Sequence, residues 1–105
     1  MEGRGRVIHI IWEFRVRPEK RTEFERHYSG SGTWARLFKK AEGYHGTVLA
    51  RDQEHPGRYL TFDLWESVAA FHEFKARYSE DYFRIDRQCE ALTEQETCLG
   101  FFEVV

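Results

Sequence analysis

Two stretches of this chain alternate like β-strands, yet neither has the polar face expected of a sheet exposed to solvent. Residues 58–65, RYLTFDLW, carry leucine or phenylalanine at every second position, with tyrosine, threonine, aspartate and tryptophan between them. Residues 7–16, VIHIIWEFRV, have one unbroken apolar face and a second face that still holds Val7 and Ile11. Successive strand residues point to opposite faces. The sequence therefore predicts a sheet that is covered on both sides.

Helical spacing and turn residues divide the rest of the chain. Pro18 and Glu19 suit a first helical turn, SGSG at 29–32 breaks the helix that follows, and Pro56 and Gly57 mark a turn. We predict helices over 19–28, over 33–43, from Ser67 and from Ser79, and further strands over 44–52 and 98–105.

The predicted order is strand, helix, strand, strand, helix, strand. This order indicates one α+β domain over residues 1–105 with a ferredoxin-like, four-stranded antiparallel sheet, in which the first and third strands are the central pair. Two helical crossovers cover only one face. We therefore expect a homodimer in which a second copy packs sheet to sheet on the other face.

Strand periodicity also predicts which side chains share a face of the third strand. We expect the helices to cover one set, and the second subunit to cover the other, which contains Asp63. The helix-facing set is Leu60, Phe62 and Leu64, and the partner-facing set is Tyr59, Thr61 and Asp63.

Composition excludes several classes of function. The net charge is −2 with acidic and basic residues mixed, which argues against nucleic acid as a partner, and the short basic pair Arg4 and Arg6 reads as a frayed terminus. No apolar run reaches the roughly 18 residues of a membrane helix, so we expect a cytoplasmic protein. Cys89 and Cys98 read as buried thiols, and no metal-ligand spacing occurs.

Three segments give the chain a resemblance to a known family. IIWEFRVRPEK leads into a helix, EGYHGTVLARD follows it, and RYLTFDLWESVAAFHEF contains a strand that ends in Trp-Glu-Ser. Together they resemble the antibiotic biosynthesis monooxygenase family of the dimeric α+β barrel superfamily, over nearly the whole chain. The family includes oxygenases that use no cofactor on aromatic polyketides, haem-degrading enzymes, and members of unknown activity.

The resemblance implies a pocket within each subunit, between the sheet and the helices. It places Trp65 at that pocket, although strand parity groups Trp65 with Asp63. In the haem-degrading branch an asparagine lies near the position of Trp12, and a histidine ligand comes late in the second helical region. This chain has no histidine after His72. The resemblance therefore favours activity without a cofactor over haem ligation.

Aromatic residues make up 16% of the chain, which suits either a well-packed core or a site for a flat hydrophobic ligand. If the break at SGSG lets the layer between sheet and helices open, seven aromatic residues are candidates to bind an aromatic compound. They are Trp12, Phe14, Tyr28, Trp34, Phe38, Phe62 and Phe83.

Asp63 and Trp65 are the candidate catalytic residues. A carboxylate between Phe62 and Leu64 has its pKa raised by desolvation, which suits a base that deprotonates a phenol before O2 reacts. The competing interpretation is structural: strand parity favours a polar cluster of Asp63 with His9, Glu13 and Arg15. Trp65 has its own alternative, as an anchor of the strand-to-helix corner.

Three functions follow. The first is a homodimeric oxygenase-like protein that binds an aromatic compound and needs no cofactor. The second is a member without catalysis that binds a small molecule or serves as a dimeric scaffold, and the third is a haem-binding protein.

Overall fold

The computed structural model describes residues 7–105, so the predicted frayed segment with Arg4 and Arg6 lies outside the described residues. The chain forms four strands, four α-helices and two short 3-10 helices within that range. They are β1 (Ile8–Val16), η1 (Pro18–Lys20), α1 (Arg21–Tyr28), α2 (Thr33–Phe38), β2 (Tyr44–Arg51), β3 (Arg58–Trp65), α3 (Val68–Arg77), α4 (Ser79–Cys89), η2 (Glu90–Leu92) and β4 (Thr93–Glu103).

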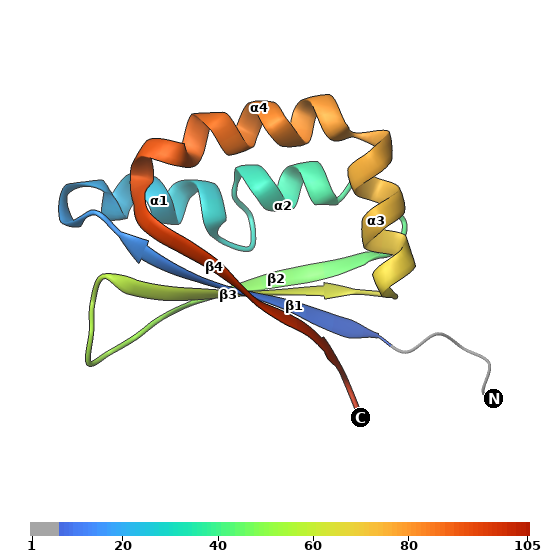
Figure 1. Cartoon of the computed structure of the whole chain (residues 1–105), viewed down its shortest axis with the longest axis horizontal. Helices are drawn as coiled ribbons and strands as arrows, with labels where there is room; N and C mark the ends of the chain where they lie inside the picture. Colours follow the sequence, from blue (N-terminus) through green and yellow to red (C-terminus); the bar gives the residue numbers. More distant parts are fainter. Residues whose placement is uncertain (1–6) are drawn as a thin grey trace.

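The sheet has the strand order β2-β3-β1-β4, and every neighbouring pair is antiparallel. This confirms the predicted α+β, ferredoxin-like fold with the first and third strands at the centre. The helices lie together on one side of the sheet, and no element of the described chain covers the other side (Figure 1). We call that uncovered side the open face.

The two faces of β3 are the reverse of our prediction. Ile10 pairs with Asp63 and Phe14 pairs with Tyr59, and directly opposed residues of an antiparallel pair share a face. Ile10 and Phe14 are buried under the helices, so Tyr59 and Asp63 are too. The error has a physical cause: alternation shows which residues share a face, but both faces of this strand are apolar enough to be buried.

Leu60, Phe62 and Leu64 consequently lie on the open face with His9 and Glu13. The predicted cluster of Asp63 with His9, Glu13 and Arg15 is therefore wrong, because Asp63 points the other way. The open face is still apolar, with Val48 61% exposed and Phe102 48% exposed.

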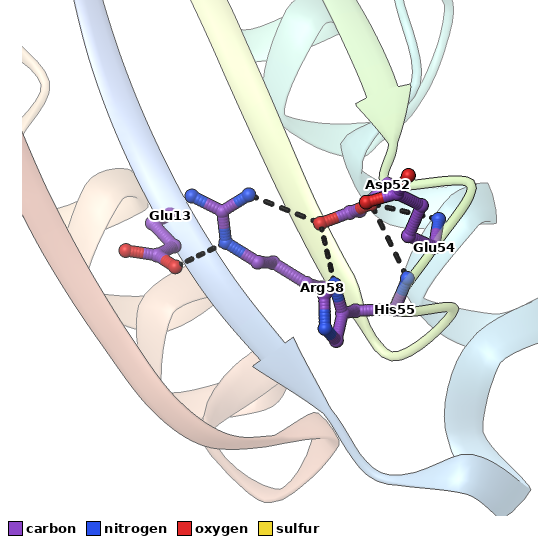
Figure 2. Close-up of polar contacts among 5 residues, drawn as sticks. All are labelled: Glu13, Asp52, Glu54, His55 and Arg58. Atoms are coloured by element: carbon purple, nitrogen blue, oxygen red, sulfur yellow. Dashed lines mark hydrogen bonds and ion pairs between the residues drawn. The ribbon is translucent and has the colours of Figure 1, made fainter.

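Glu13 pairs with Arg58, which also contacts the β2–β3 turn. Arg58 Nε donates to Glu13 Oε2 at 2.5 Å, and Arg58 Nη1 donates to Asp52 Oδ2 at 3.1 Å (Figure 2). The other oxygen of Asp52 accepts the main-chain N–H groups of Glu54 and His55, and these bonds hold the pKa of Asp52 below its usual range. This network fixes the hairpin that sets the register of β2 against β3.

Helix α1 is tied to the sheet through Glu25. Its Oε2 accepts from Tyr59 Oη at 2.5 Å and from Arg51 Nη1 at 3.0 Å. Helix α3 begins as predicted, because the Ser67 hydroxyl accepts the N–H of Ala70 at its N-terminus.

The last strand begins five residues earlier than predicted. Residues 93–97, TEQET, have no apolar face, yet they pair with the end of β1 and form the first part of β4. A bulge opposite Ile11 and Trp12 is accommodated by Gly100, whose φ of 144° favours glycine. Cys98, on the edge strand β4, is exposed, against our prediction, whereas Cys89 is buried as predicted.

Candidate functional site

A cavity lies between the sheet and helices α1, α2 and α4. The space open to the centre of a water molecule is about 50 Å³, and the whole space between the side chains, with its mouth, is about 460 Å³. Since one water needs roughly 10 to 15 Å³ by the first measure, the cavity holds about four waters or a ligand of about one ring. Its lining is Trp12, Phe14, Tyr28, Trp34, Phe38, Thr47, Thr61, Asp63, Tyr82, Asp86 and Glu96.

Trp34 is at the centre of the aromatic wall on the helix side, where it contacts three other rings. Its ring centroid lies 6.2 Å from Tyr28, 5.8 Å from Phe38 and 5.0 Å from Tyr82, the last in an edge-to-face arrangement. On the sheet side, the rings of Trp12 and Phe14 stack at 6.3 Å. Rings in such contacts present both faces and edges to a flat ligand.

Asp63 is the buried carboxylate of this cavity, with 8% of the residue exposed. Its Oδ1 accepts from Thr47 Oγ1 at 2.7 Å, and Thr47 Oγ1 lies 2.6 Å from the Tyr44 hydroxyl. Because the Thr47 proton goes to Asp63, its oxygen accepts from Tyr44. The chain of bonds from Tyr44 through Thr47 thus supports the ionised form of Asp63.

Burial works against that ionised form. It raises the pKa of Asp63 from 3.8 to about 6, although the bond from Thr47 lowers it. A carboxyl group that titrates there is ionised at neutral pH and can still accept a proton readily. Asp63 therefore has the properties of a general base.

Two tyrosines line the cavity and keep their protons. Burial, followed by Asp86, Glu96 and Asp63, raises the pKa of Tyr82 to about 12, and burial raises the pKa of Tyr28 even further. Both hydroxyl groups are therefore hydrogen-bond donors at neutral pH.

The site lies beside the linker that joins α1 to α2. A side-chain carbon at Gly30 would stand 2.8 Å from the main-chain oxygen of Thr47, and one at Gly32 would stand 2.5 Å from the main-chain oxygen of Arg26. The SGSG segment thus packs closely on β2 and α1. Its role as a hinge stays a prediction.

Five of the seven predicted aromatic residues line the cavity: Trp12, Phe14, Tyr28, Trp34 and Phe38. The other two do not. Phe62 lies on the open face, where its ring is 6.2 Å from His9, and Phe83 is 54% exposed on α4. Ligand binding by the five stays a prediction.

Trp65 faces the helices but does not line the cavity. It is fully buried, and its ring lies 5.6 Å from Phe38, 5.3 Å from Tyr44 and 5.4 Å from Phe71. This environment agrees with the alternative interpretation, in which Trp65 anchors the corner between β3 and α3 by packing. A catalytic role for Trp65 stays a prediction.

Sequence reasoning missed five lining residues. Thr61 was placed on the wrong face, and Glu96 lay in a segment that was not predicted as a strand. Tyr82 stood in the helical stripe of α4, which could have identified it. Asp86 lies one turn further along that helix. Thr47 is opposite Asp63 because of the register between β2 and β3, which the sequence does not show.

The described residues contain no group of three His, Cys, Asp or Glu side chains arranged to hold a metal ion. They also contain no helix that is long and apolar enough to cross a membrane.

A sequence model of the antibiotic biosynthesis monooxygenase family matches residues 7–84. Among solved structures, a putative antibiotic biosynthesis monooxygenase from Bordetella bronchiseptica is similar, with 25% identity, a TM-score of 0.78, and coverage of 95% of this chain and 98% of that one. SnoaB from Streptomyces nogalater, a cofactor-independent oxygenase, shares the fold at 18% identity and a TM-score of 0.68, covering 95% and 94%. No curated protein sequence matches the chain.

Proposed function

Because the chain belongs to the antibiotic biosynthesis monooxygenase family, we propose that its cavity binds a small hydrophobic phenol and oxidises it with O2, without a cofactor. The observation that carries this proposal is Asp63, a buried carboxylate with a pKa of about 6 inside an aromatic cavity of about one ring in size. The likeness to SnoaB, which works without a cofactor, supports it.

The proposed chemistry needs little from the protein beyond binding and one base. Asp63 accepts the phenolic proton as the ring gives an electron to O2. The phenoxyl radical and superoxide then combine at a ring carbon that carries hydrogen, ortho or para to the oxygen, and the peroxide takes the proton back from Asp63 to become a hydroperoxide. Loss of water leaves a quinone, so one oxygen atom enters the product and the other leaves as water. The aromatic walls exclude bulk water, and Tyr28 and Tyr82 can donate hydrogen bonds to the oxygen species.

Oxygen uptake with a panel of quinols and phenols tests this function. We expect the wild type to consume O2, with a rate that falls below about pH 6 as Asp63 becomes protonated. Asp63→Asn keeps the shape and should lose at least tenfold in rate, whereas the exposed Phe83→Leu should not. Equal rates in Asp63→Asn and wild type would refute the role of Asp63. Binding without any O2 uptake would support a member that only binds its ligand.

We also propose that a second copy covers the open face. The support is its composition, since Val48 and Phe102 are exposed there and Ile11, Leu60 and Phe62 are only half-buried in the single chain. Sedimentation at micromolar concentration should show a dimer. A well-folded monomer would contradict this proposal.

A further inference from the structure

The cavity is unusual in its charge. Among residues 7–105, its lining includes the carboxyl groups of Asp63, Asp86 and Glu96 and no lysine, arginine or histidine. Lys75 Nζ lies 4.8 Å from the centre of the Tyr82 ring, but Lys75 does not line the cavity. A phenol with an acidic side group would therefore meet like charge at Asp63 and at the exposed carboxyl groups of Asp86 and Glu96.

Asp63 is only partly satisfied by the protein. Its Oδ1 accepts from Thr47, and within residues 7–105 its Oδ2 has no hydrogen-bond partner, although the residue is 8% exposed and lines the cavity. Since Oδ2 is not one of the fully buried polar atoms without a partner, it is open to the cavity and can accept a hydrogen bond there. A hydroxyl group on a bound ligand can therefore donate to it directly.

The three carboxyl groups lie at two ends of the cavity. Asp63, on β3, is opposite Ile10, and Glu96, on β4, is opposite Phe14, so they are two strands and four residues of β1 apart. With strands about 4.8 Å apart and about 3.3 Å per residue, their Cα atoms are roughly 16 Å apart. Asp86 lies at the same end as Glu96. Burial is the main cause that raises the pKa of Glu96, and the charge of Asp86 raises it further.

The aromatic walls also favour a cation between these ends. Trp34 and Tyr82, whose rings are 5.0 Å apart, present π faces and edges beside Asp86 and Glu96. A metal ion does not suit this end, because no three carboxyl or other ligand groups in the described chain are close enough to hold one. An organic ammonium group needs no such convergence.

We propose that the ligand of this cavity is a phenol with a protonated amine on a short arm, its hydroxyl against Asp63 and its amine toward Asp86 and Glu96. This inference rests on the proposed function, since it names the substrate class of the same cavity. The hydroxyl donates to the free oxygen of Asp63, and the ammonium offsets the charge of the other two carboxyl groups.

Calorimetric titration with three para-substituted phenols, whose short arms differ in charge, tests the inference. The probes are tyramine, para-ethylphenol and para-hydroxyphenylpropionate, which carry a cationic, a neutral and an anionic arm. We expect tyramine to bind about tenfold more tightly than ethylphenol, and the propionate to bind most weakly. Because the attraction is between charges, the preference should shrink as salt is added.

Variants locate the preference within the cavity. In Asp86→Asn with Glu96→Gln, tyramine should bind no more than about twofold better than ethylphenol, whose own affinity should be unchanged. Glu90→Gln, an exposed carboxylate at the end of α4 outside the lining, is the matched control and should keep the preference. If the double variant does not fold by circular dichroism, Asp86→Asn alone, on the helix surface, should still reduce the preference.

The outcomes separate this inference from the function on which it rests. If ethylphenol or the propionate binds as tightly as tyramine, the charge preference is refuted while phenol binding stands. If the double variant keeps the full preference, the amine does not lie near Asp86 and Glu96. If none of the three phenols binds, both proposals are contradicted.

Discussion

Replacing Asp63 with asparagine should make the protein less sensitive to pH. Asparagine keeps the size of the side chain and the oxygen that accepts from Thr47, but it cannot ionise. In the wild type, folding raises the pKa of this carboxyl group from 3.8 to about 6. Folding therefore favours the protonated form, so this group stabilises the protein below pH 3.8 and loses that contribution as pH rises through about 6.

The magnitude follows from the size of the shift. A difference of about two pKa units corresponds to about 3 kcal/mol, of which about 2 kcal/mol is lost between about pH 4 and pH 7. Because asparagine introduces its own constant cost of burying an amide, the absolute stabilities of the two proteins do not test the argument. The change of their difference with pH does.

Urea unfolding of both proteins, followed by tryptophan fluorescence at several pH values, measures that change. We expect the free energy of unfolding of Asp63→Asn minus that of the wild type to rise by about 2 kcal/mol from about pH 4 to pH 7. All other titrating groups are common to both proteins and cancel in the difference. A difference that stays constant across this range would show that Asp63 is not desolvated, and the argument for a general base would fail with it.

Three further substitutions, one of them with a matched control, test the packing and the proposed dimer. Ser67→Ala removes the cap of α3 and should lower the free energy of unfolding by about 1 kcal/mol in urea. Gly32→Ala places a carbon against main-chain oxygens of α1 and should cost about 1 to 3 kcal/mol, whereas Ser31→Ala in the same linker should be nearly neutral; equal losses would contradict this. Val48→Lys should convert the proposed dimer to monomers in sedimentation without unfolding them, and a persistent dimer would place the interface elsewhere.

The order of elements and the central strand pair were predictable because they depend on local signals. Alternation marks β1 and β3, glycine and proline mark the turns, and handedness then leaves one arrangement. The C-terminal strand was not predictable in full. Its segment TEQET is held by pairing with β1, and such a long-range contact leaves no local pattern in the sequence.

The candidate site was half predictable for a related reason. Trp12, Phe14 and Trp34 could be assigned because their own strand or helix has one clearly apolar side. Asp63 could not be placed, because both faces of β3 are hydrophobic and only the register with β1 decides between them. The residues that give the cavity its charge lie far apart in the sequence, and the fold alone brings them together.

The three tryptophans allow a direct test of where a phenol binds. Trp12 and Trp34 line the cavity, whereas Trp65 is buried outside it and serves as an internal control. We would follow the three indole N–H signals by NMR, assigned with single Trp→Phe variants, while adding tyramine or ethylphenol. Shifts at Trp12 and Trp34 that exceed those at Trp65 are the expected result. Saturable binding that leaves the Trp12 and Trp34 signals unmoved would show that the ligand does not occupy this cavity.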